Sequence, residues 1–184
     1  MPAKRVAFAH GRTLVTSRLV LVFVLAGLVV VSATLTPSFP ILTAAAIGAI
    51  FAAYGIVFVL SPLLTEHWLT RSRLILRQGW YFRAVIPFAD IRDITESDDA
   101  GRGRVPLGIH RPMGQPTLFV TGGRTGLLTL RLNRPRRFWQ SFGLFATSIL
   151  FDVTDRPGFL AAFAERRASL PPVQAERSDP ELRD

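Results

Sequence analysis

The sequence contains no cysteine, so disulfide bonds, thiolate metal ligands and cysteine nucleophiles are excluded. Lysine is almost absent as well: Lys4 is the only one, so arginine carries nearly all of the basic charge behind a formal net charge of +9. Charged residues of either sign are missing between Arg18 and Glu66. Because 49% of the 184 residues are hydrophobic, the composition indicates a membrane segment joined to one small domain.

The arginine excess has two interpretations. It is typical of proteins that contact anionic lipid or nucleic acid, and it is equally the background of an arginine-rich genome. No recognition helix or known nucleic-acid motif accompanies the arginines, so we do not expect a nucleic-acid partner.

The uncharged stretch is long enough for two membrane-spanning helices, since one span needs about 20 apolar residues. Two prolines in the sequence TPSFP, residues 36–40, disfavour a continuous helix. We therefore predict a transmembrane helical hairpin over residues 19–64, with spans at about 19–35 and 41–64. The short connection makes the two spans antiparallel neighbours.

Small residues recur along one stripe of the second span. They are Ala44, Gly48, Ala52 and Gly55. Such a stripe lets another helix approach closely, and we expect the first span near Gly27 to occupy it. A homodimer seam is the alternative use.

Basic residues flank the hairpin on both sides, with Lys4, Arg5, Arg12 and Arg18 before it. Since cytoplasmic flanks are rich in Lys and Arg, we predict a multi-pass protein of the cell (inner) membrane with both termini in the cytoplasm. Residues 1–18 then form a basic cytoplasmic arm. A cleaved signal peptide ending near Ala33 is the rival interpretation, and even then the second span would deliver the following domain to the cytoplasm.

Period-two hydrophobicity begins after the hairpin and predicts a β-rich cytoplasmic domain over residues 65–170. Leu74 and Leu76 should face the core, with Arg73, Ile75 and Arg77 on the opposite face. Gln78-Gly79 should form a turn that leads to a return strand over 80–86, followed by a strand over 91–96. Residues 97–116 are rich in Gly and Pro and are expected to form a long loop.

The second half of the domain shows further strands and one helix. The sequences TLFVT (117–121) and LLTLRL (127–132) predict a hairpin with Leu128, Leu130 and Leu132 facing inward. A last strand over 148–153 should lead into an amphipathic helix over 156–168, with Thr154 and Asp155 as capping residues. Residues 171–184 should be a disordered tail. Together these elements predict an α+β fold: about seven antiparallel strands that form a barrel or sandwich, plugged by the C-terminal helix.

The stretch LTRSRLILRQGWYFRAVIPFADI, residues 69–91, resembles the signature of bacterial pleckstrin-homology-like (PH-like) domains, which commonly lie beside membrane spans. The matching features are Thr70, Arg73-Leu74, Gly79, the strand Trp80–Arg83, and Ile86-Pro87 with Ile91. The resemblance covers about residues 65–168. It implies a PH-like fold, and most such bacterial domains lack an assigned activity. The long loop and the aromatic segment 134–149 depart from the pattern.

Catalytic and metal-binding interpretations find little support. The three histidines, His10, His67 and His110, are far apart in the sequence and lack metal-ligand spacing. Glu96, Asp98 and Asp99 are interpreted as a solvated loop. An acid/base pair of Asp152 and Asp155 is conceivable, although Asp155 is better explained as a helix cap, and Gly122-Gly123 as a hairpin turn. We expect no cofactor and no metal.

Arginine and aromatic side chains define the candidate surface for a membrane or a partner. Its residues are Arg71, Arg73, Arg77, Arg83, Arg134, Arg136, Arg137, Phe138 and Trp139. The aromatic members either enter the membrane interface beside lipid phosphates or fill the barrel. We therefore predict a non-enzymatic, membrane-anchored interaction module that binds a protein partner or anionic lipid head groups. Of these two, we favour the protein partner. A homo-oligomer and an accessory subunit of a membrane enzyme or transporter are the alternatives.

Overall fold

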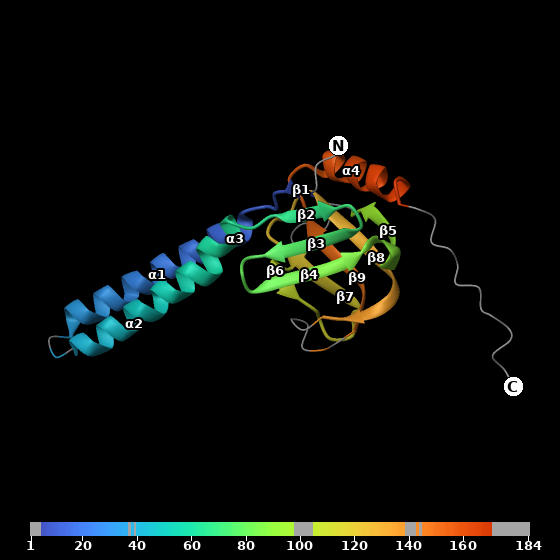
Figure 1. The fold of residues 1–184 in the computed structure, drawn as a ribbon. Coiled ribbons are helices and arrows are strands. Elements are labelled where there is room, and N and C mark those ends of the chain that lie inside the picture. Colours follow the sequence, from blue (N-terminus) through green and yellow to red (C-terminus); the bar gives the residue numbers. More distant parts are fainter. Residues whose placement is uncertain are drawn as a thin grey trace, which may run out of the picture.

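The computed structural model describes residues 5–36, 38, 40–97, 105–138, 143 and 145–170. It confirms the α+β class: two long apolar helices on the N-terminal side project from a domain of two mostly antiparallel sheets (Figure 1). A C-terminal helix lies against the domain. The predicted disordered tail 171–184 lies outside the described residues.

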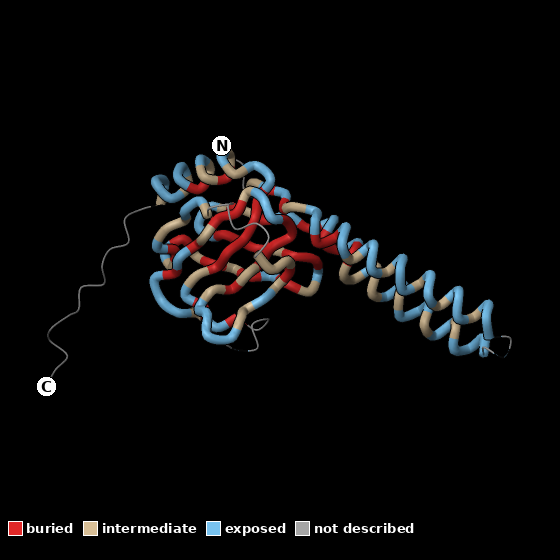
Figure 2. The backbone as a smooth tube through the Cα atoms, turned by 180° about the vertical axis from the view of Figure 1, so that it is seen from behind, coloured by how far each residue is buried: buried red, intermediate tan, exposed pale blue. Residues whose placement is uncertain are grey.

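The two long helices are the segments Thr13–Leu35 and Ile41–Leu63, each apolar and long enough to cross a bilayer. The first is α1; the second comprises α2 (Ile41–Tyr54), the π-helical segment η1 (Gly55–Leu60) and the short α3 (Ser61–Leu63). Few residues are buried in the apolar parts of either helix, unlike in the core helix of a soluble protein (Figure 2).

Helix α1 begins at Thr13, earlier than the predicted residue 19. Its first turn packs into the domain, where Leu14 and Val15 are buried. Arg18, predicted to precede the first span, lies inside this helix. Its guanidinium group donates hydrogen bonds of 2.9 Å to the Phe58 carbonyl and the Tyr81 hydroxyl.

The contact between the two long helices differs from the expectation. The half-buried positions of α2 include Ile47, Phe51 and Tyr54, whereas Gly48 is exposed. A Cβ added at Gly27, Gly48 or Gly55 would meet nothing within 4 Å. The glycines of the predicted stripe are therefore not closely approached, whereas Ala44 of the stripe is half-buried together with Ile47, Phe51 and Tyr54.

Residues 5–18 are part of the fold rather than a separate arm. Strand β1 (Arg5–Phe8) pairs antiparallel with β2 (His67–Thr70), so the segments before and after the helical hairpin join one sheet. The Ala9 carbonyl also accepts a hydrogen bond of 2.8 Å from the Thr154 N–H. Pairing of β1 could not be inferred from four residues with no clear alternation.

The first sheet has the order β1-β2-β3-β4, with β3 at Arg73–Gln78 and β4 at Phe82–Pro87. Its predicted β3–β4 hairpin is confirmed, and Gly79 adopts a φ of 66° in the turn. Leu74 and Leu76 are fully buried, as the alternation predicted.

The second sheet has the order β5-β8-β9-β7-β6. Its strands are β5 (Ile91–Glu96), β6 (Gly108–His110), β7 (Thr117–Thr121), β8 (Leu127–Arg137) and β9 (Phe145–Asp152), and the short 3-10 helix η2 (Phe88–Asp90) leads into it. Strand β6 lies within the predicted loop 97–116. The described residues thus hold nine strands rather than about seven.

The predicted hairpin of β7 and β8 is wrong, although Leu128, Leu130 and Leu132 are buried as expected. Strand β9 inserts between the two, antiparallel to β8 and parallel to β7. The reason is burial: Ile149 and Phe151 of β9 are fully buried, and a strand in the middle of a sheet needs hydrogen-bonding neighbours on both sides.

Helix α4 (Arg156–Ala168) has the predicted bounds, and the Asp155 carboxylate caps it by accepting a hydrogen bond of 3.0 Å from the Gly158 N–H. Its buried Phe159 lies edge-on to the rings of Phe8 and Phe151, at centroid distances of 5.1 and 5.5 Å. The helix therefore closes the core between the sheets. The PH-like assignment stays a prediction.

Candidate functional site

The outer face of the first sheet gathers most of the predicted arginines. Along β3, Arg73, Ile75 and Arg77 point away from the buried leucines. On the neighbouring β4, Arg83 lies directly opposite Arg77 and Val85 directly opposite Ile75. The pairing register therefore brings arginines separated in the sequence onto one surface.

Strands β1 and β2 extend this surface with a tryptophan and one more arginine. Trp68 lies opposite Ile75, and the guanidinium carbons of Arg5 and Arg77 lie 4.6 and 4.5 Å from the centre of the Trp68 ring. Each cation–π contact at an exposed site contributes about 0.5–1 kcal/mol. Trp68 thus restricts the positions of two arginines, and it was not among the predicted site residues.

A groove of about 800 Å³ lies on this surface. It is lined by Arg5, Trp68, Thr70, Arg71, Ser72, Arg73, Ile75, Arg83 and Val85. We call these residues together with Arg77 the arginine face. Four of its arginines were predicted as site residues: Arg71, Arg73 and Arg83, which line the groove, and Arg77.

The arginine face carries positive charge that the described residues leave unneutralised. No carboxylate lines the groove. The ion pairs found in the described part of the chain join Arg131 to Asp93, Arg136 to Asp90 and Arg156 to Glu96. Like charges directly opposite on neighbouring strands, as for Arg77 and Arg83, are destabilising without a counter-ion. The face is therefore suited to bind an anion.

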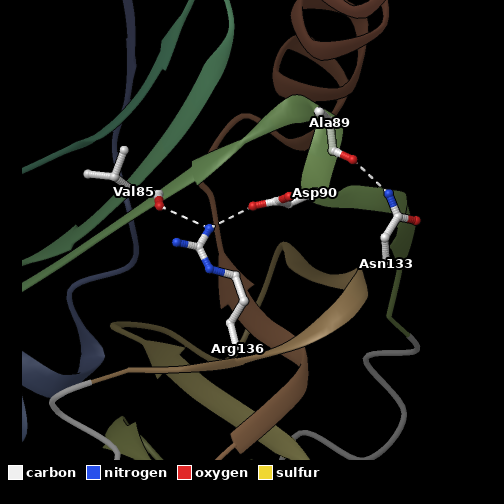
Figure 3. Close-up of polar contacts among 5 residues, drawn as sticks. All are labelled: Val85, Ala89, Asp90, Asn133 and Arg136. Carbon is white, nitrogen blue, oxygen red and sulfur yellow. Dashed lines mark hydrogen bonds and ion pairs between the residues drawn. The ribbon is translucent and has the colours of Figure 1, made fainter. Parts of the chain in front are cut away.

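Arg136 belongs to the fold rather than to this surface (Figure 3). Its guanidinium group lies 3.0 Å from the Asp90 carboxylate and 3.4 Å from the Val85 carbonyl. Nearby, the Asn133 amide donates a hydrogen bond of 2.7 Å to the Ala89 carbonyl. These contacts join the end of β8 to β4 and η2, so Arg136 has a structural role, and its assignment to a binding surface stays a prediction.

The remaining predicted residues that the structure describes are divided between the core and the exposed end of β8. Phe138 is 7% exposed and belongs to the core, which fits the barrel-filling interpretation. Arg137 lies over the ring of Phe145 at 4.4 Å, and Arg134 is exposed on β8. Trp139 lies outside the described residues.

A buried polar cluster near the helix–domain junction was missed from the sequence. His10 and His67 are 7% and 1% exposed, and their ring centres are 5.4 Å apart. Asp152 accepts hydrogen bonds of 2.6 Å from the N–H groups of Gly11 and Gly122. The cluster joins β1, β2 and β9, so only the sheet pairing could have revealed it.

Burial changes the titration of this cluster. It lowers the pKa of His67 to about 3, and the nearby His10 adds to the effect. Burial also raises the pKa of Asp152, against the two backbone N–H groups that favour its carboxylate form. The Nδ1 atom of His67 accepts the Arg77 N–H at 3.1 Å, so the ring is held in its neutral form.

Chemistry at this cluster is limited by its composition. Among the described residues, no group of three His, Cys, Asp or Glu side chains is placed to hold a metal ion. His110 lies apart, with Nε2 2.7 Å from the Leu107 carbonyl oxygen. Glu96 is paired with Arg156, and Asp98 and Asp99 lie outside the described residues. The cluster thus fastens the Gly11 segment to the domain.

No family model, curated protein or solved structure matches the chain.

Proposed function

We propose that the chain is a membrane-anchored, non-enzymatic binding protein whose arginine face binds an anionic partner at the cytoplasmic surface. The observation that carries the proposal is the groove itself, which is lined by four arginines and by no carboxylate. Guanidinium groups stay protonated at any physiological pH, so they hold carboxylates or phosphates but do not exchange protons. That property favours binding over catalysis.

Membrane anchoring is supported by the exposure of both long helices and by the way they join the domain. Strand β1 precedes α1, and its neighbour Gly11 is hydrogen bonded to Asp152. Cleavage after α1 would separate an edge strand from its own sheet. This arrangement favours a retained hairpin over a removable signal sequence.

The joint between hairpin and domain supports a fixed placement of the arginine face. The Trp80 N–H donates to the Ser61 hydroxyl at 3.2 Å, and the Gly79 N–H donates to the Thr65 hydroxyl at 2.9 Å. Arg18 links both helices to Tyr81 of the same turn. The β3–β4 turn therefore stays at the end of the hairpin.

Anionic lipid head groups are a second candidate partner. Trp80 is 60% exposed beside the end of the hairpin, and tryptophan prefers the depth of the membrane interface. Arg77 and Arg83 are close to that turn in the sequence. Each could add about 1 kcal/mol of attraction if it lies at an anionic surface.

The test uses the full chain in zwitterionic nanodiscs, with fluorescent poly-glutamate as the probe and anionic nanodiscs as a second arm. The double variant Arg73→Gln/Arg83→Gln should weaken probe binding, since exposed charge pairs contribute up to about 1 kcal/mol each. The control Arg92→Gln/Arg134→Gln changes the net charge equally at exposed positions of the other sheet. Equal loss in both variants, or no binding at all, would contradict the proposal.

A further inference from the structure

The arginine face has two basic ends and an apolar middle. One end holds Arg77 and Arg83, which lie opposite each other, and the other end holds Arg73. Between them, Ile75 and Val85 form a cross-strand pair, and Trp68 adjoins Ile75 on the next strand. Arg83 and Arg73 line the groove, and Arg77 lies beside it. A ligand that lies along the face therefore needs negative charge at both ends and an apolar group between them.

The spacing of the two ends can be read from the strand. Arg73 and Arg77 are four residues apart on β3, which corresponds to about 13 Å at the usual rise of a strand. A single phosphate or carboxylate is too small to contact both ends. In an extended peptide, side chains at positions i, i+2 and i+4 point the same way and cover the same 13 Å.

An anionic bilayer cannot attract both basic ends of the arginine face equally. The β3–β4 turn is held against the end of the hairpin, and Figure 1 shows the strands running from that turn into the domain. Arg73 lies at the far end of β3, up to about 20 Å along the strand from Gly79. The Debye length at physiological ionic strength is about 8 Å, so an anionic leaflet attracts Arg73 only weakly.

Two features prepare the face for a ligand. Trp68 already positions the guanidinium groups of Arg5 and Arg77, which reduces the side-chain entropy lost on binding. An acidic group placed between Arg77 and Arg83 would also relieve the repulsion between them.

We propose that the arginine face binds an extended acidic segment of a partner protein, with acidic side chains at positions i and i+4 and an aliphatic side chain at i+2. This inference rests on the proposed function, because it specifies the occupant of the same groove. The acidic side chains pair with the two basic ends, and the aliphatic side chain packs on the half-buried Val85, next to Ile75, of which only 8% is exposed.

The experiment measures fluorescence anisotropy of labelled peptides with the full chain in zwitterionic nanodiscs. The probe peptide contains the unit Glu-Thr-Leu-Thr-Glu once, so its two glutamates are not adjacent. A shuffled peptide has the same composition with adjacent glutamates, and a third peptide has glutamine in place of glutamate. We expect the probe to bind at least about fivefold more tightly than the shuffled peptide, and the glutamine peptide not to bind.

Variants then assign the contacts. Arg73→Gln and Arg77→Gln should each weaken probe binding by about two- to fivefold. Val85→Thr removes apolar surface at similar size and should reduce the preference over the shuffled peptide. Arg92→Gln/Arg134→Gln is the control and should change neither affinity nor preference. An unchanged melting temperature shows that each variant is folded.

The outcomes separate the two levels of the proposal. Equal affinity for probe and shuffled peptides, still lowered by Arg73→Gln, would overturn the acidic-segment inference and leave an anion-binding face. Anionic nanodiscs could instead displace the probe and bind in a way that depends on Arg73. That result would show that the ligand of the arginine face is a lipid head group and not a peptide. Failure of every anionic probe to bind would overturn the proposed function as well.

Discussion

Replacing His67 by asparagine should change how the stability of the domain depends on pH. The imidazole is 1% exposed, lies 5.4 Å from the ring of His10 and accepts the Arg77 N–H through Nδ1. The amide oxygen of asparagine can accept the same N–H but does not titrate. The variant therefore removes the proton equilibrium and keeps an acceptor for the strand.

The magnitude follows from the pKa of His67, which is about 3 in the folded protein against 6.5 for an unperturbed histidine. As the pH falls below 6.5, the unfolded chain binds a proton that the folded chain does not bind. The free energy of unfolding then decreases by up to about 1.4 kcal/mol per pH unit. Between pH 7.5 and pH 4.5, this group alone should lower it by about 3 kcal/mol.

Asp152 acts in the opposite direction. Because its pKa is raised in the folded protein, the folded chain keeps a proton that the unfolded chain loses at a lower pH. Its contribution stabilises the fold as the pH falls toward the usual aspartate range, so the pH profile of the wild type is a sum of opposing slopes. The comparison with His67→Asn isolates the histidine.

The assay is urea unfolding of the full chain in a nonionic detergent, followed by tryptophan fluorescence at several pH values from 7.5 to 4.5. We expect the wild type to lose about 3 kcal/mol more than the variant over this range. Any pH-independent cost of the substitution cancels in the comparison. Parallel curves that differ by less than about 0.5 kcal/mol in their change would refute a buried, neutral His67.

Two further substitutions test the joint between the helices and the domain. In Gly11→Ala, the new Cβ would lie 2.6 Å from the Gly123 Cα. We therefore expect urea unfolding to show that the free energy of unfolding falls by about 1–3 kcal/mol. The control Gly27→Ala, whose Cβ would meet nothing within 4 Å, should leave the stability of the domain unchanged. Equal stability of the two variants would show that the Gly11 segment is not tightly packed. In Tyr81→Phe, loss of the hydrogen bond from Arg18 should lower the free energy of unfolding by about 0.5–1.5 kcal/mol. Amide hydrogen exchange in the β3–β4 turn should become faster. Unchanged exchange would show that this hydrogen bond does not hold the turn.

Local patterns in the sequence were sufficient for part of the structure. The uncharged stretch and its prolines predicted the ends of the helices at Leu35 and Ile41, because composition alone decides which residues avoid water. Alternation and a turn glycine predicted the β3–β4 hairpin, and a capping aspartate with an apolar face predicted α4. In each case the signal and the element occupy the same few residues.

Contacts between distant segments were not predictable in this way. The hairpin expected for β7 and β8 failed because β9 inserts between them, and nothing within residues 117–132 records that choice. The small-residue stripe of α2 is a similar case: its composition permits a close approach, but a Cβ added at Gly48 or Gly55 would meet nothing within 4 Å.

The candidate site also has a part that could be predicted from the sequence and a part that could not. The sequence alone determined that β3 and β4 carry arginines on one face, since strand periodicity fixes the direction of each side chain. Only the tertiary structure shows that Arg5 and Trp68 lie on that face. It also shows that Arg136 pairs with Asp90 and that His10 lies beside His67. Those outcomes depend on which strands pair and in what register, and that is settled by burial of the whole core.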